Sequence, residues 1–163
     1  MCQIITTHFD IEIDASSSGQ ISVEVDPRVT NAEQLAVLHK YGFTRLSVGV
    51  QDLNPVVQGA IGRLQSFEQT REIIEAAREI GFEQVNLDLI YGLPYQTCDS
   101  FTRTLDQLDP LAPDRYALFG YAHLPNALPH QCNVDTKRLP DAKQRLTLFL
   151  HAYEQFKKRG YQA

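Results

Sequence analysis

Four polar residues each fall at or just past the C-terminal end of a predicted strand: Glu24, Gln51, Asp88 and His123. Carboxylates accept hydrogen bonds from hydroxyl groups, and glutamine supplies both a donor and an acceptor. Asp88 interrupts an apolar segment, where an isolated buried carboxylate is very costly, so we expect it to be paired or at a wet end of the strand. Barrel enzymes build their sites from such strand ends. The spacing therefore predicts a small-molecule site.

The cysteines and histidines form no recognisable metal motif. Cys2, Cys98 and Cys132 lie too far apart for a CxxC or CxxxCxxC ligand set, so we assign no metal ligand in this chain. Residues 1–10 are too short and too polar for a secretory signal, and the odd cysteine count predicts reduced thiols in the cytoplasm. A lone loop histidine usually packs or forms a hydrogen bond, and we expect this of His123. The other histidines have weaker cases for catalysis: His8, His39, His130 and His151.

Hydrophobic periodicity predicts four strands, each followed by a helical segment. We expect strands at 21–25, 45–50, 85–90 and 115–121, and helices at 30–41, 66–81, 100–108 and 140–159. Thr30 to Glu33 and Ser66 to Gln69 have the spacing of capping boxes. A short helix is expected after Asn54-Pro55, and Ser16 to Gly19 form a polar turn.

The strand–helix alternation is typical of an α/β barrel or a doubly wound sheet. No glycine-rich phosphate turn follows the first strand, which favours the barrel. Four strands cannot close a barrel, so the strand count is the difficulty for this interpretation and implies a sheet with unpaired edges. The strands near Ile21 and Arg115 would be its edges, and we expect self-association or poor solubility unless a partner chain or the first twenty residues cover an edge.

Composition excludes several other classes. The 163 residues contain 15 Lys+Arg and 20 Asp+Glu, giving a net charge of −5, and 43% are hydrophobic, as in a globular domain of average size. No apolar run approaches the roughly 18–20 residues of a membrane span. A mild acidic excess without basic clusters argues against nucleic acid as the main partner.

Several segments in a fixed order carry a more specific signal. They are Ile21–Arg28 (ISVEVDPR), Arg45–Asp52 (RLSVGVQD), Asn86–Pro94 (NLDLIYGLP), Tyr91–Thr97 (YGLPYQT) and Gly120–Pro125 (GYAHLP). Together they resemble the radical S-adenosylmethionine (SAM) enzymes of the oxygen-independent coproporphyrinogen III oxidase family. The resemblance covers about residues 9–163.

The resemblance implies that this chain is the middle of a longer enzyme. The family fold is a partial barrel of six β/α units, and the segments here resemble its strands three to six. The resemblance thus implies a partial TIM-like (β/α) barrel of about four consecutive β/α units, with residues 1–163 as one domain. We therefore expect that the strand with the CxxxCxxC motif, the glycine-rich strand after it and a C-terminal helical domain belong to parts of the enzyme outside these 163 residues.

The resemblance also implies five SAM-binding residues. Glu24 would help to hold the SAM bound to the cluster, whereas Gln51, Arg63, Asp88 and Ala122 would surround a second SAM. Arg63 offers a planar fork for the methionyl carboxylate. Asp88 suits ribose hydroxyls or the ammonium group, and Ala122 would contribute backbone groups and room.

Structural alternatives stay open for several of these features. Glu24 could be a loop carboxylate paired with Arg28, and Arg63 could be a surface residue. The run from Tyr91 to Pro94 could simply end a strand. Cys98 and Cys132 are expected in loops. We expect the aromatic residues of the fourth strand to belong to the core rather than to a porphyrin platform: Tyr116, Phe119 and Tyr121.

The reaction implied by the resemblance starts at a [4Fe-4S] cluster, whose cysteine ligands are absent from this chain. The cluster reduces SAM, and a 5′-deoxyadenosyl radical removes hydrogen from a propionate, which then loses carbon dioxide. Two rounds convert coproporphyrinogen III to protoporphyrinogen IX in haem biosynthesis. We expect the isolated chain to lack this reaction. Three alternatives remain: a radical SAM-like haem chaperone, a non-catalytic binding or assembly fragment, and an unrelated barrel hydrolase or lyase using Glu24 and Asp88.

Overall fold

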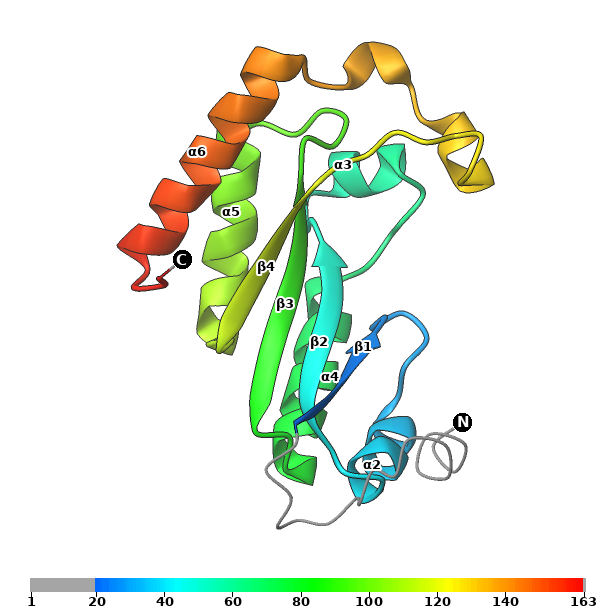
Figure 1. Ribbon diagram of the computed structural model, residues 1–163, viewed down its shortest axis with the longest axis vertical. Coiled ribbons are helices and arrows are strands. Elements are labelled where there is room, and N and C mark those ends of the chain that lie inside the picture. The colour runs from blue at the N-terminus through cyan, green and yellow to red at the C-terminus, as the bar shows by residue number, and fades with distance from the viewer. Residues whose placement is uncertain (1–19, 163) are drawn as a thin grey trace.

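The computed structural model describes residues 20–162 (Figure 1). The predicted polar turn at Ser16 to Gly19, together with Cys2 and His8, lies outside the described residues. None of the helices described combines the length and hydrophobicity that a membrane crossing requires.

Strands and helices alternate along the chain as predicted. The strands are β1 (Ile21–Val25), β2 (Phe43–Gln51), β3 (Gln84–Tyr91) and β4 (Arg115–Gly120). The helices are α2 (Ala32–Lys40), α3 (Pro55–Ala60), α4 (Phe67–Ile80), α5 (Cys98–Leu108) and α6 (Ala142–Lys158). Three short 3₁₀ helices, which were not predicted, are η1 (Asp109–Leu111), η2 (Pro129–Asn133) and η3 (Thr136–Arg138).

The four strands form one parallel sheet in the order β1-β2-β3-β4. Strands adjacent in sequence are therefore adjacent in space, and the helical segments between β1 and β4 each connect two neighbouring parallel strands. Within the described residues β1 and β4 are the edges of the sheet, as predicted. The sheet is an open segment, because β1 and β4 do not pair with each other.

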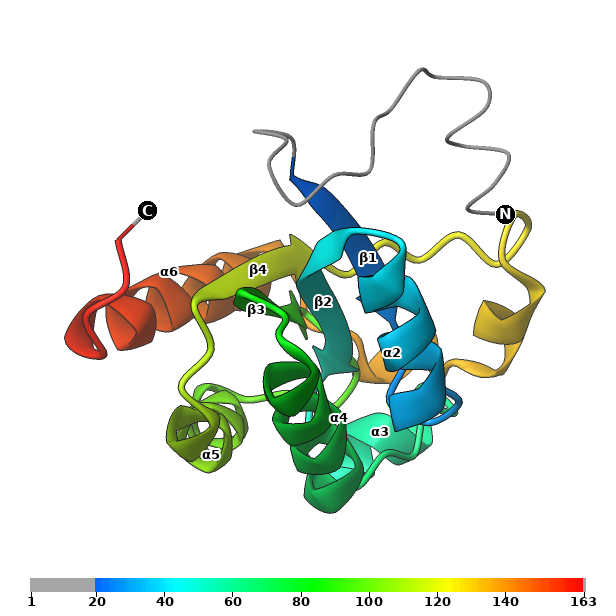
Figure 2. The same ribbon diagram turned by 90° about the horizontal axis from the view of Figure 1, so that it is seen from below.

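One face of the sheet carries the hydrophobic core. Helices α2, α4 and α5 pack on this outer face, and α6 lies beside α5 and β4 (Figure 2). Alternate strand residues such as Val48, Leu87 and Leu89 point into this core and meet Ile74 of α4 and Phe101 of α5. These five side chains are almost completely buried, so the helices are held by apolar packing against the outer face.

Capping residues define where the main helices begin. Ser66 and Gln69 form the predicted box at α4, and Gly81 ends that helix in the left-handed conformation with φ 112°. The box of α2 is one residue later than predicted: Asn31 and Gln34 exchange side chain and backbone hydrogen bonds of 2.9 Å. The prediction was wrong by one residue because Thr30 and Glu33 have the same spacing as the true pair.

Leu87 in the central strand β3 tests the packing of the outer face. We expect Leu87→Ala to lower the free energy of unfolding by about 2–5 kcal/mol, since the surrounding core cannot collapse fully into the cavity. Urea denaturation followed by circular dichroism measures this change. As a matched control, Leu64→Ala alters a side chain that is 68% exposed, and its effect should stay below about 0.5 kcal/mol. Equal losses in the two variants would contradict this account of the core.

Candidate functional site

The face of the sheet opposite the helices is polar. Glu24, Ser47, Asn86 and Asp88 occupy the alternating positions that face away from the core, and they line a groove of about 490 Å³. The strand register places Glu24 beside Ser47, and Ser47 beside Asn86. We call this surface the inner face. It presents hydrogen-bonding groups where the outer face presents apolar ones.

Two neighbours hold the buried carboxylate of Asp88. Ser47 Oγ donates to Asp88 Oδ2 (2.8 Å), and Asn86 Nδ2 donates to Asp88 Oδ1 (2.7 Å) and to Ser47 Oγ (2.6 Å). The expectation that Asp88 must be paired is confirmed. Each carboxylate oxygen can accept a further hydrogen bond from a group in the groove, whereas Asn86 Oδ1 is buried away from the groove, without a partner in the described part of the chain. The groove therefore retains acceptors for hydroxyl or ammonium groups.

Glu24 lies in the same groove, exposed near the end of β1. The alternative pairing with Arg28 is not observed, because the Arg28 guanidinium turns to Asp26 at 2.7 Å. Within residues 20–162 the Glu24 carboxylate takes part in no ion pair. The structure thus leaves this carboxylate facing the groove.

The other three predicted residues meet at the carboxyl ends of the strands. Gln51, Arg63 and Ala122 line one pocket of about 530 Å³, which we call the upper pocket. Gln51 ends β2 with φ 67°, a conformation uncommon for a residue other than glycine. The β2–β3 register also shifts between Gly49 and Gln51. Such an irregularity redirects a strand end, here at the wall of the upper pocket.

The Arg63 guanidinium is fixed by the protein itself. Its Nη1 donates to Asp26 Oδ2 (2.9 Å), and its Nη2 donates to the Gly49 carbonyl (2.8 Å). Arg63 Nε is buried and has no partner among the described residues. Two of the three nitrogens of the predicted fork thus hold the loop after β1 to the end of β2. The position is partly buried, unlike the surface residue of the alternative interpretation.

Asp26 joins two arginines beside the upper pocket. Arg28 binds it through Nε, Nη2 and its backbone amide, with distances of 2.7–3.1 Å. The side-chain hydrogen bond from Arg28 lowers the pKa of Asp26 most, and the Arg28 amide and the charge of Arg63 add to this against the effect of burial, giving a pKa of about 2. Sequence reasoning missed this cluster, although Asp26 and Arg28 both belong to the ISVEVDPR motif.

Ala122 follows β4 in an extended loop that Gln131 supports. Gln131 Nε2 donates to the Ala122 carbonyl (3.1 Å), and Gln131 Oε1 accepts from the Leu124 amide. The Ala122 side chain is exposed and lines the upper pocket. The Ala122 carbonyl already accepts one hydrogen bond.

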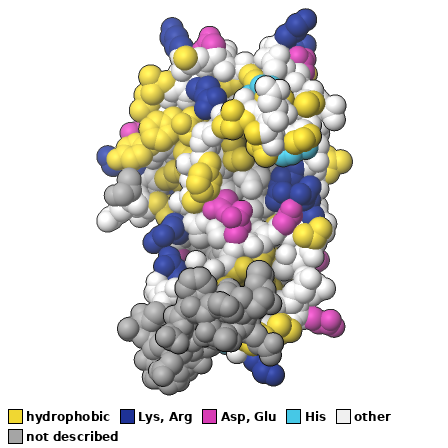
Figure 3. Space-filling model, turned by 45° about the vertical axis from the view of Figure 1, so that its right-hand side comes forward, with side chains coloured by type: hydrophobic (Ala, Val, Ile, Leu, Met, Phe, Trp, Pro, Cys, Tyr) yellow, Lys and Arg dark blue, Asp and Glu magenta, His cyan; other side chains and the backbone are white. Residues whose placement is uncertain are grey.

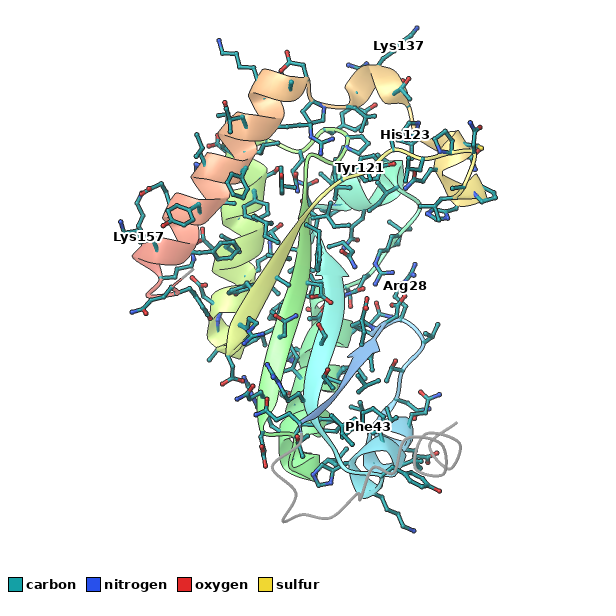
Figure 4. The ribbon with its side chains drawn as sticks, viewed as in Figure 1. Arg28, Phe43, Tyr121, His123, Lys137 and Lys157 are labelled. Atoms are coloured by element: carbon teal, nitrogen blue, oxygen red, sulfur yellow. The ribbon has the colours of Figure 1, made fainter. Side chains whose placement is uncertain are left out.

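Three histidines make packing or hydrogen-bonding contacts with neighbouring side chains. His123 Nδ1 lies 3.2 Å from Tyr121 Oη, and both residues follow β4 (Figure 4). His151 Nε2 lies 2.7 Å from Thr102 Oγ1, which joins α6 to α5. His39 packs against Phe82 with ring centroids 5.5 Å apart. These contacts confirm packing and hydrogen-bonding surroundings for the three residues.

The aromatic residues of the fourth strand do not form a common platform. Tyr116 packs on the outer face against Phe156 and Tyr161, with ring centroids 4.9 Å apart in each pair. Phe119 lines the groove of the inner face and is 53% exposed, whereas Tyr121 is buried beside the upper pocket. The core interpretation is therefore confirmed for Tyr116 and Tyr121 and wrong for Phe119.

Neither described cysteine lies in a loop, contrary to the prediction. Cys98 is the first residue of α5, because Thr97 accepts from the Ser100 amide and caps the helix. Cys132 lies in η2 and is exposed. Both thiols are free.

A buried carboxyl that sequence reasoning missed holds the strand ends together. Asp52 follows β2, and its Oδ1 accepts from the Asn54 amide (2.6 Å) and Thr104 Oγ1 (3.0 Å). Its Oδ2 accepts from Gln96 Nε2 (2.7 Å). Burial raises the pKa of Asp52 although these hydrogen bonds oppose the shift. The sequence signal was present, since Asp52 directly follows a strand and Gln96 lies two residues after Pro94 of the YGLP turn.

Two buried glutamines extend this polar layer toward Arg63. Gln58 Nε2 donates to the carbonyls of Asp52 and Gln65 (2.8 Å each), while Gln58 Oε1 accepts from the Gln65 amide (3.1 Å). Gln65 Nε2 donates to Thr70 Oγ1 (2.8 Å) in α4. The segment that carries Arg63 is thus held at both of its ends.

The side chains of the groove and the upper pocket suit SAM but not an iron–sulfur cluster. The groove and the upper pocket offer carboxylates, amides and a guanidinium, which match the hydroxyl, ammonium and carboxylate groups of SAM. In the described part of the chain no group of three or more Cys, His, Asp or Glu side chains could hold a metal ion. The residues present therefore fit part of a SAM site and do not fit a cluster.

Comparison with known proteins identifies the class. The profile described as "Radical SAM superfamily" matches residues 5–108, and this chain belongs to that superfamily, whose members use SAM together with a [4Fe-4S] cluster. The oxygen-independent coproporphyrinogen III oxidase of Pseudomonas aeruginosa is 43% identical over 157 residues, covering 96% of this chain and 34% of the relative. The Escherichia coli K12 protein of the same name is 40% identical over 162 residues, covering 99% and 35%.

Solved structures agree on the fold. The structure of E. coli coproporphyrinogen III oxidase (HemN), described as a radical SAM enzyme, superposes with a TM-score of 0.87 at 40% identity and covers 99% of this chain and 36% of that chain. The radical SAM methyltransferase TsrM of Kitasatospora setae, at 19% identity and a TM-score of 0.57, shares the fold over 64% of this chain. The predicted partial TIM-like barrel is confirmed. The chain spans about a third of the length of the oxidases it matches.

The hydrogen bonds of Asp52 predict that replacing its carboxylate with an amide of the same size will destabilise the fold. In Asp52→Asn an amide nitrogen replaces one carboxylate oxygen and faces a donor, since Gln96 is fixed by further bonds to Gly92 and Ile90. We expect the free energy of unfolding at neutral pH to fall by about 1–3 kcal/mol, the cost of an unsatisfied buried group. The exposed Glu72→Gln is the control for loss of one negative charge. If both variants unfold at the same urea concentration, Asp52 does not hold the strand ends.

The low pKa of Asp26 predicts that its contribution to the free energy of unfolding changes with pH in the acid range. Its folded-state pKa of about 2 lies below the ordinary 3.8, so the ionised carboxylate stabilises the fold above about pH 4 and this contribution is lost as the pH falls through about 2. The stability difference between wild type and Asp26→Asn should therefore be constant near neutral pH and shrink below about pH 4. Urea titrations at a series of pH values measure it, with Glu79→Gln as an exposed control. A difference that persists undiminished toward pH 2 would refute the assignment.

Proposed function

We propose that this chain is the SAM-binding central part of an oxygen-independent coproporphyrinogen III oxidase, which decarboxylates coproporphyrinogen III oxidatively to protoporphyrinogen IX. The observation that carries the proposal is 40–43% identity to oxidases of that name over 96–99% of the chain. The five residues of the site support it, because they divide between two adjacent hollows of suitable chemistry. The proposal treats residues 1–163 as one partial barrel domain.

Each residue has a role that follows from its surroundings. Asp88 keeps one free acceptor position on each carboxylate oxygen, and it would accept hydrogen bonds from ribose hydroxyls or the ammonium group of the second SAM. Gln51 and Arg63 would orient the methionyl end in the upper pocket, and Ala122 would leave space for it. In this proposal Glu24 binds the SAM held by the cluster, and the other four residues bind a second SAM that would extend from Asp88 in the groove into the upper pocket.

The cofactor chemistry is shared with parts of the enzyme beyond these residues. When bound, the reduced cluster and SAM supply the 5′-deoxyadenosyl radical that removes hydrogen from a propionate. The described residues bind and orient SAM in this proposal, and no cluster ligand is assigned to them. We therefore expect this chain alone not to decarboxylate the substrate.

The rival functions have less support. The oxidase relatives favour decarboxylation over a haem chaperone. A non-catalytic binding or assembly fragment is favoured by one observation, the wide spacing of Cys2, Cys98 and Cys132. The proposal further includes a cytoplasmic location, which suits the free thiols of Cys98 and Cys132, and self-association through the strand edges β1 and β4.

Calorimetric titration of the purified chain with SAM tests the proposal. We expect binding by the wild type, and a loss of affinity of roughly 10- to 100-fold in Asp88→Ala, because hydrogen bonds to a charged group are lost. Asp88→Asn keeps the size of the side chain and separates the charge from the packing. Glu79→Ala removes an exposed carboxylate from α4 and should bind like the wild type.

Circular dichroism of each variant establishes that it is folded before titration. Absence of SAM binding by the folded wild type would reject a preformed SAM site in this chain. Equal affinity of the wild type and both Asp88 variants would reject the assignment of Asp88. Decarboxylation of coproporphyrinogen III by the chain alone, after cluster reconstitution, would reject the division of the chemistry between this chain and the rest of the enzyme.

A further inference from the structure

The cluster around Asp26 carries more positive than negative charge. Asp26 is the partner of both Arg28 and Arg63, at 2.7 Å and 2.9 Å. The three side chains are only 19–33% exposed, so one positive charge is left over at a partly desolvated place. Such a charge is stabilised when a second anion completes the cluster. On the face in Figure 3, basic side chains gather beside an acidic one with a histidine close by.

Arg28 is the member of the cluster that can reach such an anion. Its Nε and Nη2 are fixed by Asp26, whereas Nη1 makes no hydrogen bond within the described residues. Arg28 lies in the loop after β1 (Figure 4) and lines the upper pocket with Gln51 and Arg63. Arg63 is less suited, because both of its Nη atoms are engaged. Asp26 therefore presents the Arg28 guanidinium to the pocket in a fixed orientation.

We propose that Arg28 is an anion-recognition residue of the upper pocket, which contacts a carboxylate of the bound ligand, and that Asp26 is its positioning residue. This inference rests on the proposed function for the identity of the ligand. The single excess charge favours a monoanion over a phosphate dianion, and the planar guanidinium matches a carboxylate. Apolar walls formed by Ile61, Ile90 and Leu93 would surround the rest of the ligand.

Two ligands of the proposed reaction carry such a carboxylate, namely SAM at its methionyl end and the tetrapyrrole in its propionates. Paired probes separate them. SAM is compared with decarboxylated SAM, and coproporphyrin III, a stable oxidised analogue of the substrate, with its tetramethyl ester in the same detergent buffer. The quantity measured is the ratio of affinities within each pair. A merely structural role of Arg28 would weaken both members equally and leave this ratio unchanged.

We expect the wild-type chain to prefer the carboxylate-bearing member of one pair, and Arg28→Gln to reduce that preference roughly 10- to 100-fold. Arg28→Lys keeps the charge without the planar fork, and its preference should lie between those of the wild type and Arg28→Gln. Asp26→Asn should reduce the preference less than Arg28→Gln, because the guanidinium is then present but mobile. Arg103→Gln, which alters an exposed arginine of α5, is the matched control and should keep the wild-type ratio.

The outcomes distinguish this inference from the proposed function. Loss of preference within the SAM pair assigns the methionyl carboxylate to Arg28, and loss within the porphyrin pair assigns a propionate. SAM binding that depends on Asp88, with both ratios unchanged in Arg28→Gln, overturns the inference and leaves the proposed function standing. Arg28-dependent preference within the porphyrin pair, without any SAM binding, rejects the SAM site and supports the inference. No preference in either pair by the folded wild type overturns the inference.

Discussion

The arrangement of the strand ends depends on one buried carboxyl. Asp52 accepts hydrogen bonds from the start of α3 at Asn54, from Thr104 in α5 and from Gln96 in the loop after β3. These donors are needed because a buried carboxylate without partners is very costly. Two segments far away in the sequence, α5 and the loop after β3, are thereby fixed to the end of β2 together with the nearby start of α3. Gln51 directly precedes this point, so its left-handed backbone is held by the same hydrogen bonds.

Gly49 joins the groove of the inner face to the upper pocket. It lies opposite Asp88 in the register, and its carbonyl accepts from Arg63. A Cβ atom at Gly49 would lie 3.1 Å from Gln51 Nε2 and 3.2 Å from Arg63 Nη2, closer than most real contacts of this kind. The close approach of these two side chains to the strand therefore favours glycine at this position. It also makes the two hollows neighbours, which two adjacent SAM molecules in the proposed site would require.

Local features of the fold were predictable from the sequence, whereas the contacts that build the site were not. The Ser66 capping box depends on Gln69, one helical turn away, and the end of α4 at Gly81 depends on its own last turn. Asp26 and Arg63 are 37 residues apart, and Asp52 and Thr104 are 52 apart, so only the folded chain reveals these pairs. The five proposed SAM residues came from family resemblance, and the structure adds that they occupy two adjacent hollows.

An open sheet segment exposes its inner face to water. Because that face is polar, its exposure costs little free energy. Ser47, Asn86 and Asp88 bind one another across β2 and β3, so water can cover them without contacting a wide apolar surface. Exposed apolar area lies instead along α6, where Phe149 is 41% and Tyr153 is 44% exposed beside β4, an edge strand within the described residues. In the proposed self-association, this apolar area on α6 would add to pairing of the β4 edge without occluding the groove in which Asp88 lies.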